Sequence, residues 1–384
     1  VVPDGGEWAA EQEEVNYNYV MTADDGERFC IYSDFETGWT EAVKLSQFLP
    51  TKVTLYSDWI APDNDGDGNG DFYYENSSGS EYGTDKGRLH LATDTIDITL
   101  DLNGHTINRN LSSSKEHGQV FRIEDGSLTI KDSSEAQTGK ITGGNNDGNG
   151  GAFYITDGSI FVESGEISGN KCTGNGAGIY SDEMICISGG KITGNTAGKA
   201  GGGVYANKSV YLGGTAVVTG NKQAQNVESN IYRPKNSVNI NQTRGQATGI
   251  PNIPLTEGAY IGITSEDTYD LISGDDSCFD QGSFGYLHAD DDNKYYIRSV
   301  YDADEGNNSH QLWYTAWADS NARYPRVKTV SIVNGNILDD AKLDYDTQVI
   351  TLKASMDASA SFKSVRLNRL ISCTFDHEGE YILD

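Results

Sequence analysis

The segment from Asp63 to Asp71 reads DNDGDGNGD and places oxygen-bearing side chains at alternate positions. Ca²⁺ in proteins takes about six to eight oxygen ligands, and the glycines between these side chains allow the chain to curl around an ion. The segment differs from an EF-hand loop, because its twelfth position is Tyr74 and not a bidentate glutamate. A solvated acidic loop is the alternative interpretation. The ligands predicted for a Ca²⁺ site are Asp63, Asp65, Asp67, Asn69 and Asp71.

A second candidate is a series of tyrosines that recur with separations of 26, 25 and 27 residues. Each follows an aliphatic residue or Phe, and neighbouring side chains of a strand point to opposite faces. If the preceding residues fill the core, the rings stack outside and offer a platform for the apolar faces of sugars. The alternative is that the rings only shield the sheet beneath them. The predicted binding residues are Tyr154, Tyr180, Tyr205 and Tyr232, with Phe161 and Tyr211 on another outward face.

Patterns that would indicate catalysis are weak. A glycosidase needs two carboxyl groups about 5 Å or about 6.5–9.5 Å apart, whereas the one adjacent acidic pair in residues 138–242, Asp182 and Glu183, would point to opposite faces of a strand. The chain has no GxSxG nucleophile elbow, and no nucleotide-binding fingerprint in its strand-loop-helix context. The sequence therefore favours a binding function.

The elements that must position these residues form a repeat. Ile141, Ile167, Ile192 and Val218 follow one another at 26, 25 and 26 residues, each inside a short run that ends in Gly and Asn or Gly. Two further apolar runs, one of them containing the tyrosines, keep the same period, so each repeat holds three short strands. Three strands in about 25 residues describe one coil of a parallel β-helix, with successive coils about 4.8 Å apart. Recurrent asparagines at the turns, Asn170, Asn195 and Asn221, are expected to bond along the axis as structural residues.

The runs GGAFY (150–154), GAGIY (176–180) and GGGVY (201–205), together with ITLDLNGHTI (98–107), resemble right-handed parallel β-helix proteins of the pectate-lyase-like type that bacteria secrete or attach to their surface. The resemblance covers about residues 51–245. It implies an extracellular or cell-surface location and a role in adhesion or display, with the signal peptide and anchor outside this chain. It also keeps open two alternatives, a polysaccharide lyase or glycoside hydrolase of the same architecture, and a structural spacer.

The flanking segments predict caps at both ends of the β-helix. Residues 37–48 carry Trp39, Val43, Leu45 and Phe48 at helical spacing and predict a short capping helix. After about residue 245 the glycine period stops and alternating strands follow. The predicted fold is all-β, divided into an N-terminal cap (1–50), a right-handed parallel β-helix (51–250), a β-rich C-terminal cap (251–325) and a shortened Ig-like sandwich (326–384).

Composition restricts the partners. The formal net charge of -29 disfavours binding to nucleic acid or to an anionic membrane surface, and no run of apolar residues is long enough for membrane insertion. The five cysteines lack the spacing of a metal site or a disulfide framework. The sequence therefore predicts a non-catalytic surface module of a longer chain, joined to adjacent domains, that binds a glycan or a surface protein.

Overall fold

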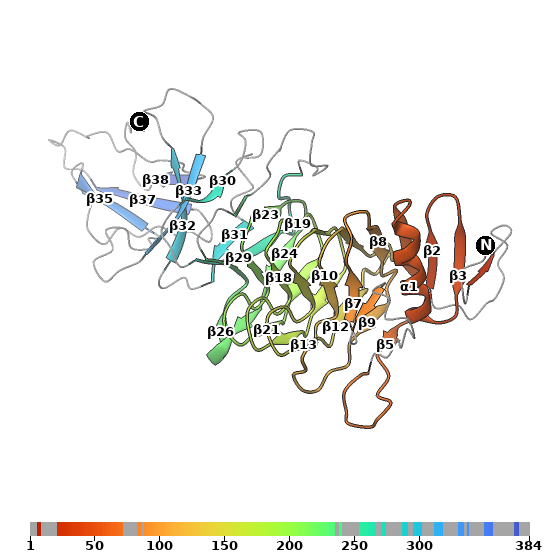
Figure 1. Cartoon of the computed structure of the whole chain (residues 1–384). Coiled ribbons are helices and arrows are strands. Elements are labelled where there is room, and N and C mark those ends of the chain that lie inside the picture. Colours follow the sequence, from red (N-terminus) through yellow and green to blue (C-terminus); the bar gives the residue numbers. More distant parts are fainter. Residues whose placement is uncertain are drawn as a thin grey trace.

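The computed structural model describes residues 21–71, 88–234, 253–265 and 286–290. Beyond these it describes short strands: 6–8, 83–85, 238–239, 270–273, 295–301, 311–317, 329–333, 336–337, 349–355 and 372–375. Most of the described chain winds into a parallel β-helix, with one α-helix at its N-terminal end (Figure 1). The all-β fold predicted from the repeat is confirmed.

Strands of successive coils pair in parallel and build three sheets. The first contains β4 (Thr51–Leu55), β8 (Asp97–Asp101), β11 (Ser127–Lys131), β15 (Ser159–Val162), β19 (Ile185–Ile187) and β23 (Val210–Leu212). The second contains β7 (Arg88–Leu91), β10 (Phe121–Ile123), β14 (Phe153–Ile155), β18 (Ile179–Ser181), β22 (Val204–Ala206) and β27 (Ile231–Arg233), with β6 (Gly83–Asp85) at its edge. The third contains β5 (Trp59–Ile60), β9 (Thr106–Asn108), β12 (Lys140–Thr142), β16 (Glu166–Ser168), β20 (Lys191–Thr193) and β24 (Val217–Thr219).

Each coil also has a short fourth ladder that the sequence pattern did not predict. It consists of β13 (Asn145–Asn146), β17 (Lys171–Cys172), β21 (Thr196–Ala197) and β25 (Lys222–Gln223). After the turn η1 (Ala224–Asn226), the chain folds back on β25 as β26 (Val227–Glu228) in antiparallel pairing.

The core lies inside the coils and consists of aliphatic columns. Ile141, Ile167, Ile192 and Val218 pair in register and are all 0% exposed, as the 25-residue period predicts. Burial of one such side chain contributes about 1.5–3 kcal/mol. Because every coil adds several of them, the stacking of coils is the main source of stability.

Glycine is required where each coil turns into the second sheet. Gly150, Gly176 and Gly201 have φ angles of +73°, +69° and +64°, a region that residues with a Cβ rarely adopt. A Cβ on Gly176 would also lie 2.5 Å from the carbonyl oxygen of Ile179. The GGAFY-type runs therefore begin with Gly for a local backbone reason.

The asparagines at the turns form the expected structural column. Asn170, Asn195 and Asn221 are 0% exposed. The Nδ2 of Asn170 donates to Oδ1 of Asn195 at 3.0 Å, and the Nδ2 of Asn195 donates to Oδ1 of Asn221 at 2.9 Å. Asn221 in turn donates to Oδ1 of Asn230 at 2.9 Å. The column thus satisfies buried turn groups along the axis.

The N-terminal cap combines α1 (Phe35–Ser46) with β1 (Gly6–Trp8), β2 (Met21–Asp24) and β3 (Phe29–Tyr32), whose antiparallel strands extend the first sheet. The side chain of Asp34 accepts a hydrogen bond from the backbone N–H of Thr37 and caps the helix. Trp39 is fully buried and meets the ring of Phe121 edge-on at 5.6 Å, so the helix closes the first coils.

The capping helix begins and ends two residues earlier than the predicted range 37–48. The prediction is wrong for one of the four residues assigned to the apolar face of the helix: Phe48 lies beyond the helix and is 77% exposed. Chain direction changes before this residue, because the helix ends at Ser46 and Pro50 follows closely.

The sheets of the β-helix continue past residue 250. β29 (Tyr260–Ser265) pairs with both β24 and β27 and joins the second sheet to the third, and β31 (Leu287–Ala289) pairs with β29. A further sheet has the order β28 (Val238–Asn239), β30 (Asp270–Ser273), β33 (Gln311–Trp317) and β32 (Tyr295–Tyr301).

In residues 326–384, the described strands are β35 (Thr329–Val333), β36 (Asn336–Ile337), β37 (Val349–Ser355) and β38 (Ser372–Phe375), which form one sheet. β37 pairs in parallel with both β35 and β38, whereas Ig-like sheets are antiparallel. The Ig-like assignment and the domain boundaries stay predictions.

Candidate binding face and calcium loop

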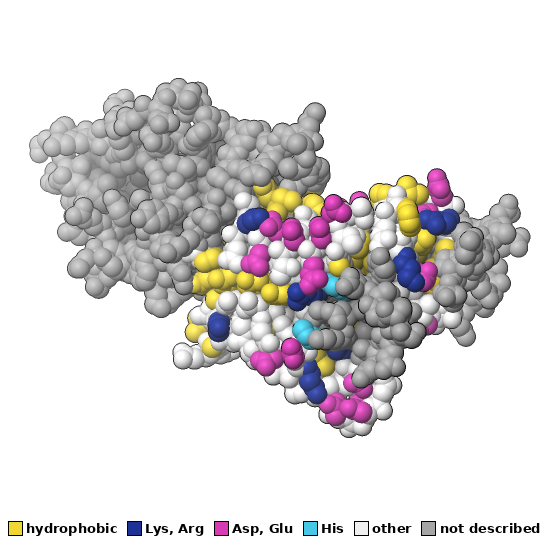
Figure 2. All heavy atoms as spheres, viewed as in Figure 1, with side chains coloured by type: hydrophobic (Ala, Val, Ile, Leu, Met, Phe, Trp, Pro, Cys, Tyr) yellow, Lys and Arg dark blue, Asp and Glu magenta, His cyan; other side chains and the backbone are white. Residues whose placement is uncertain are grey.

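The four predicted tyrosines lie on the outward side of the second sheet and stack on one another. Register places Tyr154, Tyr180, Tyr205 and Tyr232 side by side on successive coils. Their ring centroids are 5.4, 5.5 and 5.3 Å apart, with interplanar angles of 21°, 11° and 11°. We call these four residues the tyrosine column. Figure 2 shows a band of hydrophobic side chains that runs along the coils on the face in view.

The stacking changes what this column can offer a ligand. The faces of the inner rings pack against each other, and the outer face of Tyr154 carries the guanidinium of Arg122, 5.1 Å from the ring centroid. At the other end, Tyr232 pairs in register with Thr264 of β29. The rings stack as the sequence predicts, so a ligand would meet the edges of the inner rings and not their faces. Sugar binding by the column stays a prediction.

A second outward column follows the tyrosine column two positions later, at the residue directly after each of the strands β10, β14, β18 and β22. Its backbone N–H groups bond to carbonyl oxygens of the preceding coil, at Leu91, Ile123, Ile155 and Ser181. Residues two apart in a strand share a face, so these side chains flank the rings. The polar column consists of Glu124, Thr156, Asp182 and Asn207.

Contacts between the two columns centre on Asp182. The Tyr180 hydroxyl donates to Asp182 Oδ1 at 3.0 Å, and Asn207 Nδ2 donates to the same oxygen at 2.6 Å. Burial, followed by the hydrogen bond to Asp182 and its negative charge, raises the pKa of Tyr180 to about 12. The phenol therefore stays protonated and remains a donor at neutral pH.

Charged groups lie at the N-terminal end of the tyrosine column and the polar column. Arg122 forms an ion pair with Glu124, and Glu124 Oε2 lies 2.8 Å from Nε2 of His90, which is 6% exposed. Burial alone would raise the pKa of Glu124, but the hydrogen bond from His90 and the charge of Arg122 outweigh it and lower this pKa. The positive charge of Arg122 is thus compensated within the protein. The sequence pattern did not identify these residues. The repeat period could have identified Arg122, because Arg122 lies in register with Tyr154.

The two other predicted aromatic residues do not join this face. Phe161 and Tyr211 lie on the outward side of the first sheet, in one column with Cys186 between them. Phe161 is half-buried, but Tyr211 is only 3% exposed. The expectation that Tyr211 presents an open ring is wrong, because β28 lies against its strand β23.

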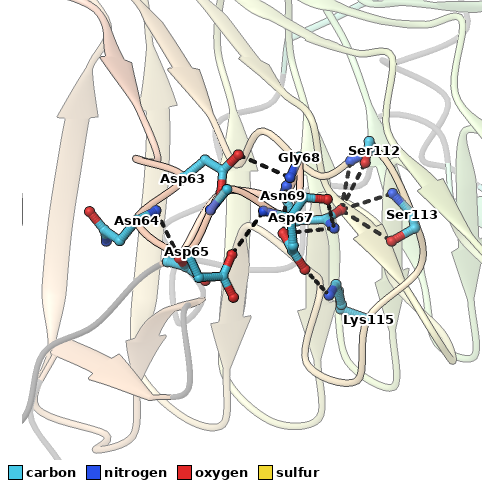
Figure 3. Close-up of polar contacts among 12 residues, drawn as sticks. Asp63, Asn64, Asp65, Asp67, Gly68, Asn69, Ser112, Ser113 and Lys115 are labelled. Carbon is cyan, nitrogen blue, oxygen red and sulfur yellow. Dashed lines mark hydrogen bonds and ion pairs between the residues drawn. The ribbon is translucent and has the colours of Figure 1, made fainter.

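The acidic loop, residues 63–71, brings three of its five predicted ligands together. Carboxylate oxygens of Asp63, Asp65 and Asp71 all lie within 4.8 Å of one another. Two backbone N–H groups bond to Asp63, that of Gly66 at 2.8 Å and that of Gly68 at 2.9 Å (Figure 3). The tight turns are possible because Gly66 and Gly68 have φ angles of +77° and +79°.

The remaining two predicted ligands point to other partners. Asp67 forms an ion pair with Lys115 at 2.7 Å, and Oδ1 of Asn69 accepts hydrogen bonds from the backbone and hydroxyl groups of Ser112 and Ser113 at 3.0–3.1 Å (Figure 3). These contacts fasten the loop to the 112–115 segment.

The residues fit a Ca²⁺ ion in the manner of the first nine positions of an EF-hand loop. Asp63, Asp65 and Asp67 occupy positions 1, 3 and 5, Gly68 occupies the glycine position 6, and Asp71 occupies position 9. Three convergent carboxylates of hard oxygen type suit Ca²⁺.

A lyase would require a base beside such an ion, and Lys115, which pairs with Asp67, is a basic residue next to the loop. Its hydrogen bond to Asp67 raises the pKa of Lys115, so the amine is held in its protonated form. Nor do the adjacent acids Asp182 and Glu183 share a partner: Asp182 bonds to Tyr180, whereas Glu183 pairs with Lys208.

No protein-family model matches the chain, and no curated protein or solved structure matches it. The resemblance to secreted β-helix proteins therefore remains a prediction from the repeat. Among the described residues, no helix has the length and apolar character needed to cross a membrane.

Proposed function

We propose that the protein is a non-catalytic β-helix module of the cell surface or the extracellular space, and that it binds an elongated ligand, a polysaccharide in the first place, along the tyrosine column and the polar column. The observation that supports this most is their parallel course over successive coils: stacked ring edges on one side, and carboxylate, hydroxyl and amide groups on the other. Aromatic surface next to hydrogen-bonding groups is the combination that recognises sugars.

The rigidity of the coil supports the same proposal. Each tyrosine is held between its neighbours, and Tyr180 is further fixed by Asp182 and Asn207. A preorganised face loses little side-chain entropy when a ligand binds. A long repeating polymer can therefore gain affinity from several coils at once.

The test is a binding screen of the purified chain against plant polysaccharides, polyuronides and mucin glycans, with release of reducing or unsaturated ends measured in the same samples. We expect binding without product release. The double variant Tyr180→Ala plus Tyr205→Ala should lose most of the affinity. The matched control, Thr193→Ala plus Thr219→Ala, removes outward side chains from the third sheet on the same part of the coil stack and should bind like the parent.

Product release would replace the proposal by the lyase or hydrolase alternative. Binding that survives loss of the tyrosines in a folded variant would move the ligand to another face. If no glycan binds, a protein ligand or a spacer function becomes the better explanation.

We also propose that the acidic loop binds Ca²⁺ and thereby holds the 62–71 segment against the coils. This rests on the convergence of Asp63, Asp65 and Asp71, and the proposed role is structural, since the loop is fastened to the 112–115 segment through Asn69 and Asp67.

A further inference from the structure

The charges around the tyrosine column restrict the kind of glycan that it can accept. Of the basic groups beside it, Arg122 is bound to Glu124 and Lys208 is bound to Glu183. Asp182 has a different environment: the hydrogen bonds to its carboxylate come from the neutral groups of Tyr180 and Asn207. The polar column thus carries one carboxylate, that of Asp182, whose charge no described cation compensates.

The two oxygens of this carboxylate have different roles. Oδ1 accepts both hydrogen bonds, from the Tyr180 hydroxyl and from Asn207 Nδ2, while Oδ2 has no partner among the described residues. Asp182 is half-buried, so Oδ2 is held in a fixed position at the surface. An ionised carboxylate is an acceptor only, and hydrogen bonds to it are about twice as strong as those between neutral groups.

We propose that Asp182 determines the ligand class of this face: an uncharged glycan, whose hydroxyl groups donate to Asp182 Oδ2, in preference to a polyuronide or a sulfated glycan. The inference rests on the proposed function and specifies it further. A sugar hydroxyl meets a charged acceptor here, whereas a sugar carboxylate or sulfate meets a like charge, and the described cations Arg122 and Lys208 are already paired. The net charge of -29 adds to this repulsion at longer range.

The experiment compares polymers that share a backbone and differ in charge. Hydroxyethylcellulose is paired with carboxymethylcellulose, and fully methyl-esterified pectin is paired with polygalacturonate. Affinity is measured at low and high salt for the parent, for Asp182→Asn and for a matched control, Glu183→Gln, which changes the neighbouring acid that pairs with Lys208. Thermal midpoints establish that each variant is folded.

We expect the parent to bind the neutral member of at least one pair more tightly, with little dependence on salt. Asp182→Asn should weaken this binding about tenfold, because a charge-assisted hydrogen bond is lost, and should narrow the preference over the acidic member. Tyr180→Phe keeps the stacked ring and removes the hydroxyl that positions Asp182, so it should weaken binding by a smaller factor. Glu183→Gln should leave the affinity for the neutral member unchanged.

Tighter binding of the acidic member, with an affinity that falls as salt rises, would overturn this inference and leave the binding face in place. Equal effects of Asp182→Asn and Glu183→Gln would overturn the role of Asp182. Absence of binding to every polymer would instead refute the proposed function itself.

Discussion

Asp290 accepts two hydrogen bonds from Asn230, from the backbone N–H to Oδ2 and from Nδ2 to Oδ1, both at 2.6 Å. Asn230 is the last member of the asparagine column, in which each residue donates its N–H and Nδ2 to the Oδ1 of the next. Along the column, the backbone N–H and one N–H of each Nδ2 therefore point toward its C-terminal end, where an acceptor is required. A carboxylate meets this requirement, and Asp290 also accepts from Thr264 Oγ1 at 2.5 Å.

Asp290→Asn is predicted to lower the free energy of unfolding by about 1–3 kcal/mol, since an amide offers one acceptor oxygen and turns an NH₂ group toward a donor. Asp290→Ala should cost more. Denaturant unfolding of both variants measures the effect, with Asp157→Asn in an exposed turn as the control. An Asp290→Asn protein as stable as the parent would show that the column needs no terminal carboxylate.

The sequence predicted the parts of the fold that follow from a local period. Tyr154 and Tyr180 stack because 26 residues make one coil, and Ile141 lies over Ile167 for the same reason. It could not predict that Tyr211 is covered, because the covering strand β28 lies outside the repeat. Nor could it predict Asp290 as the partner of Asn230, which is 60 residues away, or that Asp67 turns to Lys115, since a ligand pattern does not show which cations the fold brings near.

A test of the asparagine column itself is Asn195→Asp. Nδ2 of Asn195 donates to Asn221 Oδ1 at 2.9 Å, to the Ile167 carbonyl at 2.9 Å and to the Thr193 carbonyl at 3.1 Å. A carboxylate would place an acceptor against these acceptors in a site that is 0% exposed. We expect a loss of about 3 kcal/mol or more in the free energy of unfolding at neutral pH.

The loss should shrink at low pH, because a protonated aspartic acid regains one donor. Asn226→Asp, at an exposed position of η1, should leave stability unchanged at every pH. If Asn195→Asp behaved like this control, the side chains of the asparagine column would add nothing to the free energy of unfolding beyond what backbone pairing contributes.

For the acidic loop, Ca²⁺ is predicted to raise the thermal midpoint of the parent. Binding to the folded state alone stabilises it by about 2.7 kcal/mol when free Ca²⁺ is 100 times the dissociation constant. Asp65→Ala plus Asp71→Ala removes two of the three convergent carboxylates and should abolish the shift. Asp67→Ala should retain part of it, because Asp67 points to Lys115. No shift in the parent, or an equal shift in the double variant, would exclude this site.

A pH dependence is expected from Glu36 in the first turn of α1. Burial, followed by the nearby charge of Asp34, raises the pKa of Glu36 to about 7, although a hydrogen bond from Trp59 and the charge of Arg109 act in the opposite direction. A carboxyl group with a raised folded-state pKa binds its proton more tightly in the folded protein. Its stabilising contribution is therefore complete below about pH 4.5 and is lost as the pH rises toward about 7.

Glu36→Gln removes this titration, so the difference in thermal midpoint between Glu36→Gln and the parent should rise between pH 4 and pH 8, measured at constant ionic strength. Glu36→Gln also removes a negative charge near the buried Arg109, which adds an offset to the difference in thermal midpoint. This offset does not change the sign of the slope of that difference against pH. Arg109 keeps its charge between pH 4 and pH 8, because burial lowers its pKa only to about 10. Glu41→Gln, which removes another acid of the same helix, paired with Lys44, serves as the control. A flat difference for Glu36→Gln would mean that Glu36 ionises in the folded protein as it does in the unfolded chain.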